Sequence, residues 1–208
     1  MRQRLPVLLF ALLTGLGCGF QMLAQTAASA LEPYVMLPEP SSLRSSTSTV
    51  PEGARRTVFT PAKEAKTKQG VETYSADEFK KIGISVDAFQ EKAKAAADRR
   101  LAQVHPEYIK DDEGVTRYAV FRGESSLIAS LVIAPKLVSQ FSAIFGEEVW
   151  AALPDRHSLY IFPPKPELLA EFTDDLAARF HNDPFAASCE VFSLKAGREP
   201  IVVADFGD

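Results

Sequence analysis

The chain contains only two cysteines in 208 residues, Cys18 and Cys189. Small exported domains are often held together by disulfides. Cys18 lies in an expected export signal described below, so Cys189 is left without a partner for an internal disulfide. The folded part must therefore be held together by its core, and a hydrophobic content of 46% makes this possible. The lack of a cysteine pair fits a bacterial periplasm better than a disulfide-rich secreted scaffold.

Motifs of the common enzyme classes are also missing. There is no glycine-rich phosphate loop, and the segment RGESS at 122–126 lacks the flanking glycine of a Gly-x-Ser-x-Gly nucleophile elbow. The three histidines, His105, His157 and His181, do not have the spacing of a zinc motif. The acidic turn at 111–113 is interpreted as solvated rather than as a calcium site. We therefore expect neither a cofactor nor a metal.

An excess of positive charge is missing as well, since 23 basic and 27 acidic residues give a formal net charge of −4. Loss of residues 1–30, which hold two arginines and no acid, would change this charge to −6. Binding to nucleic acid depends on neutralising phosphates with Lys and Arg. We therefore do not expect nucleic acid as a partner.

The first 30 residues have the pattern of a secretory signal peptide. Arg2 and Arg4 precede an apolar run at 5–13, and Ala28-Ser29-Ala30 supplies small residues for a signal peptidase. We predict cleavage after Ala30 and export to the periplasm or the cell exterior.

Two alternatives for the N-terminus stay open. The uncharged run at 5–31 is long enough to span a bilayer as an uncleaved anchor. Lipidation of Cys18 is the other alternative, although Gly15 and Leu16 stand in the wrong order for a lipoprotein signal. In either case the chain would reach a membrane only through its N-terminus.

The rest of the chain divides into two parts by composition. Residues 31–74 are rich in Pro, Ser, Thr and charge, with few large apolar residues, which is typical of disorder. We predict a disordered tether over 31–74 and a single folded domain over 75–208. The domain begins at the capping-box pattern Ser75-Ala-Asp-Glu78.

Hydrophobic periodicity predicts an α+β fold for the domain. Two helices, at 75–82 and 86–104, are expected to lead it. Strands and helices then alternate, with strands at 127–133, 149–153, 159–162, 189–194 and 200–204 and helices from Pro135 to Phe145 and from Pro166 to Phe180. Two further strands flank the turn at 111–114. Adjacent hairpins indicate a mainly antiparallel sheet with helices packed on one face, preceded by the two N-terminal helices.

The segment ALPDRHSLYIFPP at 152–164 contains the most concentrated set of reactive side chains, Asp155, Arg156 and His157. Pro154 occupies the second place of a predicted type I turn, so the cluster is expected at the exposed tip of a hairpin. Substitutions at such a tip usually cost under about 0.5 kcal/mol. A Cys189–His157 pair is not expected, because the alternation of SCEVFSL places Cys189 with Val191 on one face.

The segment GEEVWAALPDRHSLYIF, with a helix before and after it, resembles the C-terminal part of the YtpQ-type family of uncharacterised bacterial proteins. The resemblance covers about 60 residues, from Phe141 to Val202. It implies an α+β fold and brings no activity, so no catalytic role is carried over. The chain departs from the family in its predicted export signal.

Two hypotheses for the function follow. The first is a non-enzymatic exported module that binds a protein, an envelope component or a small ligand, with an envelope protein as a possible partner and Asp155, Arg156 and His157 as binding residues. The second is an envelope hydrolase of unrecognised type that uses the same three residues. The absence of an activity motif favours the first hypothesis.

Overall fold

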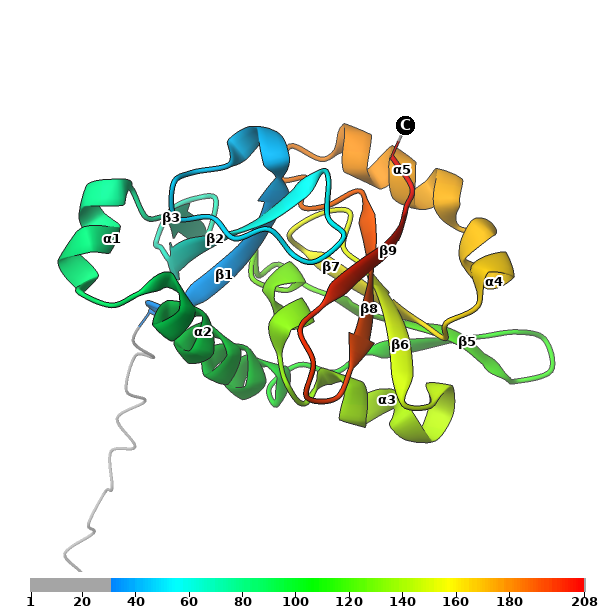
Figure 1. The fold of residues 1–208 in the computed structure, drawn as a ribbon. Helices are drawn as coiled ribbons and strands as arrows, with labels where there is room; N and C mark the ends of the chain where they lie inside the picture. The colour runs from blue at the N-terminus through cyan, green and yellow to red at the C-terminus, as the bar shows by residue number, and fades with distance from the viewer. Residues whose placement is uncertain (1–30, 208) are drawn as a thin grey trace, which may run out of the picture. The chain divides into compact units, whose positions relative to one another are not determined.

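Nine strands in two antiparallel sheets form the frame of residues 31–207, the part of the chain that the computed structural model describes (Figure 1). The smaller sheet has the order β1 (Val35–Pro40), β2 (Thr57–Glu64), β3 (Val71–Thr73). The larger sheet has the order β4 (Glu107–Lys110), β5 (Thr116–Arg122), β7 (Ser158–Phe162), β6 (Glu148–Ala152), β8 (Glu190–Lys195), β9 (Ile201–Asp205). The predicted α+β class and mainly antiparallel sheet are confirmed.

Five α-helices connect the strands of the described residues: α1 (Ala76–Ile82), α2 (Val86–Leu101), α3 (Leu137–Phe145), α4 (Pro166–Ala170) and α5 (Thr173–Asn182). The capping box predicted at α1 is present, because the Ser75 hydroxyl accepts from the backbone N–H of Glu78 and the Glu78 carboxylate accepts from that of Ser75. Gly83 ends the helix at φ 74°, a conformation that glycine adopts without strain. The predicted helix from Pro166 to Phe180 is divided at Glu171.

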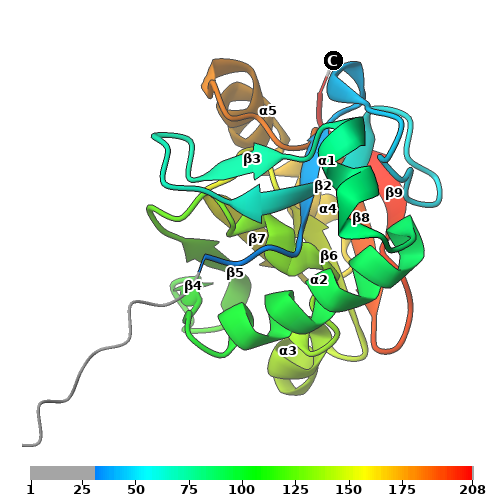
Figure 2. The same ribbon diagram turned by 90° about the vertical axis from the view of Figure 1, so that its left-hand side faces the viewer.

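The larger sheet buries both of its faces, because successive side chains of a strand point to opposite sides. Ala119 and Phe121 of β5 pack on the side of α2 and α3. Val120 of the same strand and Tyr160 of β7 pack on the side of α4 and α5. Figures 1 and 2 show these two helix pairs on different sides of the sheet. The prediction that the helices pack on only one face of the sheet is therefore not confirmed.

Residues 31–74 are folded, and the prediction of a disordered tether is wrong. Their apolar residues are few, but Met36, Leu37, Val58 and Phe59 are almost completely buried. Met36 and Phe59 join the core of the larger sheet, where Phe59 stacks on Phe192 at 5.8 Å between ring centroids. Composition failed here because the residues that cover this segment lie far away in the sequence. The folded domain thus includes residues 31–74, and three strands precede its first two helices.

Residues 127–133 were expected to form a buried strand, but they contain the short 3-10 helix η2 (Ala129–Ile133). All seven side chains are buried, as predicted. A short apolar run without clear periodicity does not distinguish a strand from a buried helical turn. The backbone forms local hydrogen bonds, such as Leu131 N–H to Ile128 O at 3.1 Å, and one distant bond, Ala129 N–H to Arg156 O at 3.2 Å. The 3-10 helix of this run packs mainly against α2 and β1.

The predicted signal peptide or anchor, residues 1–30, lies outside the described residues. Within residues 31–207, no helix is both long and apolar enough to cross a membrane.

Candidate functional site

The loop of residues 153–157 joins β6 to β7, and the two strands pair antiparallel as predicted. Its predicted position at an exposed tip is wrong, because residues 185–188 cover it. Ala187 N–H donates to Pro154 O at 3.0 Å, and Ser188 N–H donates to Leu153 O at 2.9 Å. Leu153, Pro154 and Asp155 are buried as a result.

Asp155 is only 5% exposed. Its Oδ1 accepts from the backbone N–H of His157 at 2.8 Å, and its Oδ2 accepts from the Ser158 hydroxyl at 2.7 Å. Both carboxylate oxygens therefore hold the loop in shape. A general base needs an oxygen that can reach the substrate, and this arrangement leaves Asp155 poorly placed for that role.

Arg156 forms a buried ion pair with Glu39 of β1, in which Nη2 donates to Oε1 at 3.0 Å. The side chains are 11% and 5% exposed. Burial raises the pKa of Glu39 and lowers the pKa of Arg156, while their pairing opposes both changes. The pair fastens the loop to the smaller sheet, so the Arg156 side chain is engaged within the protein.

His157 is half-buried, and its ring packs edge-to-face on Phe185 with 5.9 Å between centroids. Its backbone carbonyl accepts from Gly123 N–H at 3.2 Å. The structure thus brings Asp155, Arg156 and His157 together in one loop, but each contacts a different neighbour. The three side chains do not converge on a shared cavity.

Cys189 precedes β8 and belongs to the core on the side of α4 and α5, together with Val191 as predicted. It is 3% exposed, and burial raises the pKa of its thiol. A nucleophilic cysteine needs the opposite, an accessible thiol with a lowered pKa. The geometry therefore gives no support to a Cys189–His157 pair.

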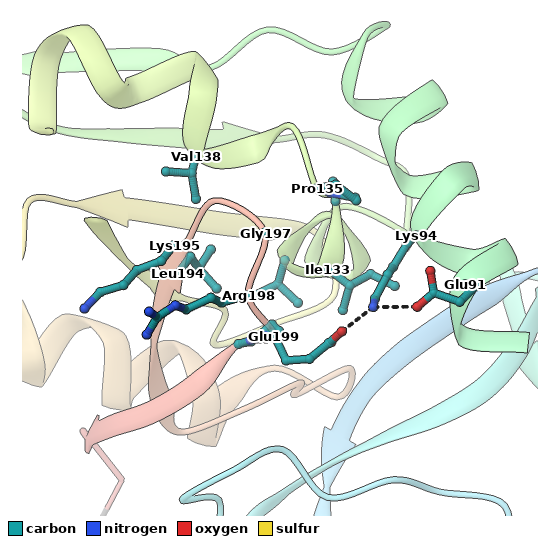
Figure 3. Close-up of a pocket in the computed structure, with 13 residues that line it drawn as sticks. Glu91, Lys94, Ile133, Pro135, Val138, Leu194, Lys195, Gly197, Arg198 and Glu199 are labelled. Carbon is teal, nitrogen blue, oxygen red and sulfur yellow. Dashed lines mark hydrogen bonds and ion pairs between the residues drawn. The ribbon is translucent and has the colours of Figure 1, made fainter. Parts of the chain in front are cut away.

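A groove lies between α2, the start of α3 and the β8–β9 hairpin, with a volume of about 190 Å³ (Figure 3). We call it the hairpin groove. Its floor is apolar and consists of Val132, Ile133, Ala134, Pro135, Val138, Leu194 and Pro200. Its rim is charged and consists of Glu91, Lys94, Lys195, Arg198 and Glu199. This combination is typical of a surface that binds an apolar group and orients it through charge.

Some charged side chains of the rim form ion pairs and one does not. The Lys94 ammonium lies between the carboxylates of Glu91 and Glu199 (Figure 3). Lys195 pairs with Glu148 at 2.9 Å. Arg198 is exposed and forms no ion pair with another residue of 31–207. The groove therefore carries one available guanidinium beside its apolar floor.

A second hollow, also of about 190 Å³, continues from the rim along β8 and β9. It shares Lys195, Arg198 and Glu199 with the hairpin groove. The hollow adds Ile201 and the exposed side chain of Val203. Arg198 thus stands between two hollows that both offer apolar surface.

Sequence reasoning missed the hairpin groove, although it predicted the elements that form it. The expected hairpin loop at 195–198 and the expected helices from 86 and from 135 are all present near these positions. The groove arises because three segments about 40 to 60 residues apart in the chain meet in space. The sequence showed only that Lys195 and Arg198 stand in a hairpin loop directly after an apolar strand.

Comparisons of the chain with protein-family models, with curated proteins and with solved structures found no match. The resemblance of residues 141–202 to the YtpQ-type family stays a prediction.

Proposed function

We propose that this chain is an exported, non-enzymatic binding module of the cell envelope whose hairpin groove binds a partner protein. The observation that carries the proposal is the apolar floor beside the available guanidinium of Arg198. An apolar side chain of the partner fills the groove, and a carboxylate near it pairs with Arg198. Arg is well suited to this because its fork binds a carboxylate through two parallel hydrogen bonds.

The size of the groove supports a protein side chain as the occupant. A volume of about 190 Å³ corresponds to about six water molecules at roughly 30 Å³ each. Pockets for larger small molecules and cofactors usually measure about 300–1,000 Å³. The groove is thus closer in size to one inserted side chain.

Binding is favoured over the hydrolase hypothesis by the contacts of the loop at 153–157. Both oxygens of Asp155 and one nitrogen of Arg156 are engaged within the protein. Hydrolysis by these groups would require the loop to release them first. The role of Asp155, Arg156 and His157 in our proposal is to hold that loop, with only the half-buried His157 ring open to a secondary contact.

Export rests on the signal pattern of residues 1–30. Cleavage after Ala30 would release the module, whereas an uncleaved anchor or a lipid on Cys18 would hold it at a membrane surface.

Reversal of one charge tests the proposal. Arg198→Glu should reduce co-purification of a specific envelope partner about tenfold, because a charge-assisted hydrogen bond contributes roughly 1.5–3 kcal/mol. Lys68→Glu is the matched control, since Lys68 is also an exposed basic residue and lies in the turn between β2 and β3, outside the groove lining. Equal recovery of the partner with Arg198→Glu and with Lys68→Glu would contradict the proposal.

A further inference from the structure

A second pocket lies on the other side of the larger sheet, between the sheet and α5, with a volume of about 80 Å³. Its polar side chains are Tyr118 and Arg122 of β5, Tyr160 of β7, and Arg179 and Asp175 of α5. We call it the arginine–tyrosine pocket. It shares no residue with the hairpin groove.

Both arginines of this pocket are directed at the same tyrosine. Arg122 Nη2 donates to the Tyr160 hydroxyl at 3.2 Å, and its Cζ lies 5.4 Å from the centre of the Tyr160 ring. The Cζ of Arg179 lies 6.0 Å from that same ring centre. The rings of Tyr118 and Tyr160 are 6.2 Å apart, so two hydroxyl groups accompany the two guanidinium groups.

The positive charge of the pocket is only weakly compensated by the described residues. Arg179 has no carboxylate within 4.0 Å, and the nearest to Arg122 is Glu107 at 4.0 Å. Asp175 lines the pocket but pairs with neither arginine. Burial raises the pKa of Tyr118, and Arg122 and Arg179 both act in the opposite direction. The positive charges of both arginines therefore act on the Tyr118 hydroxyl at the pocket.

We propose that the arginine–tyrosine pocket binds a single phosphate group, either as the free ion or as a phosphate monoester. Guanidinium groups match phosphate oxygens in geometry and charge, and tyrosine hydroxyls donate further hydrogen bonds. The donors belong to two neighbouring strands of the sheet, β5 and β7, and to α5, so they line the pocket from the sheet and from the helix. A volume of about 80 Å³ is room for two or three water molecules at roughly 30 Å³ each.

This proposal does not depend on the function proposed for the hairpin groove. The two sites use different residues on different sides of the sheet, so a variant at one site leaves the other intact. A phosphate group bound here would bridge β5 and β7 to α5. It would also neutralise two exposed cations of an otherwise acidic protein.

Titration with inorganic phosphate at constant ionic strength, followed by amide chemical shifts, tests the proposal. The Tyr118, Arg122, Tyr160 and Arg179 region should respond and saturate. Arg122→Gln and Arg179→Gln should each weaken binding about tenfold or more, because each removes a charge-assisted hydrogen bond. Arg44→Gln is the matched control, since Arg44 is an exposed arginine outside the pocket. Thermal melts of each variant establish that it is folded.

A second arm distinguishes the two sources of phosphate. Binding to phosphatidylcholine vesicles is measured with and without phosphatidic acid, a lipid with a phosphate monoester headgroup. Saturable binding of the free ion supports a site for inorganic phosphate. Binding only to vesicles that contain phosphatidic acid supports a site for a lipid headgroup. In both cases the arginine variants must lose the binding. Tyr118→Phe, which keeps the ring, repeats the test if an arginine variant does not fold. Absence of binding in both arms, or equal weakening by Arg44→Gln, would overturn the proposal.

Discussion

Glu39 and Arg156 are separated by 117 residues in the chain, yet they form a buried ion pair between β1 and the loop at 153–157. Burying two charges is expensive, so such a pair contributes little net stability compared with apolar residues of similar shape. Removing one partner is different, because it leaves the other charge buried and uncompensated. The main effect of the pair is thus to make each of its members intolerant of substitution.

Arg156→Ala should therefore lower the free energy of unfolding by about 3 kcal/mol. Glu39→Ala should have a similar effect, and the double variant should cost clearly less than the sum of the two, as measured by urea denaturation. The expected loss for Arg156→Ala is thus much larger than the loss of under about 0.5 kcal/mol expected for a residue at an exposed hairpin tip. His157→Ala serves as the control within the same loop and should cost about 0.5 kcal/mol. Equal small losses for Arg156→Ala and His157→Ala would contradict the role of the ion pair.

At the scale of elements, α1 shows how local contacts define a helix end. Hydrogen bonds from the backbone and the side chain of Ser75, and then from Lys63, lower the pKa of Glu78 from 4.5 to about 2. The pKa is lower in the folded state than in the unfolded state. The contribution of Glu78 is therefore present above about pH 4.5 and is lost as the pH falls toward 2.

Amide hydrogen exchange near the start of α1 should accordingly become faster as the pH falls from 4.5 toward 2, after correction for the intrinsic rate. Glu78→Gln should weaken this pH dependence, because the glutamine side chain does not titrate. Asp77→Asn, in the same first turn but without a side-chain hydrogen bond among the described residues, is the control. An unchanged pH dependence in Glu78→Gln would show that the capping box does not control this helix end.

Elements with strong local signals were predicted well from the sequence. The Ser75–Glu78 capping box, the strands on both sides of the 153–157 loop, and the last hairpin all depend on neighbours within a few residues. Residues 127–133 and β1 were not predicted correctly, because their conformation depends on partners distant in the chain. The burial of 127–133 could be predicted, unlike its backbone conformation, because all of its residues except Ser130 are apolar.

At the scale of the whole molecule, residues 31–74 complete the fold instead of linking it to a signal. β1 and β2 pack on the core of the larger sheet. The connection before β2 covers the outer edge of β9, where Val202 N–H donates to Glu52 O at 2.8 Å. The opposite edge strand, β4, is short and carries Glu107 and Lys110, which discourages pairing with another chain.

Deletion of residues 31–74 should therefore abolish cooperative unfolding. Each of the buried side chains Met36, Leu37, Val58 and Phe59 contributes roughly 1.5–3 kcal/mol. Their sum is comparable to the total stability of an ordinary domain, about 5–15 kcal/mol. Thermal melts of residues 75–208 and, as the control, residues 31–208 provide the test. A cooperative transition of residues 75–208 near that of the control would show that the segment is dispensable.

The candidate site could not be predicted at this scale from the sequence. The most reactive cluster in the chain, Asp155, Arg156 and His157, serves mainly to hold its own loop. The hairpin groove has no local motif, because its floor and rim are assembled from α2, η2, α3 and the last hairpin. A groove of this kind becomes visible only when the positions of distant segments are known.

The most direct test of the binding proposal is photo-crosslinking in intact cells from a reactive amino acid placed at position 195 of the full chain, an exposed position on the groove rim that leaves Arg198 in place. The same amino acid at position 112, in the exposed turn between β4 and β5, is the control. We expect one dominant crosslinked partner protein from position 195, which is absent from position 112 and is reduced when Arg198→Glu is added. Identical crosslinking patterns from positions 195 and 112, or no product from position 195, would contradict the assignment of the hairpin groove as the binding surface.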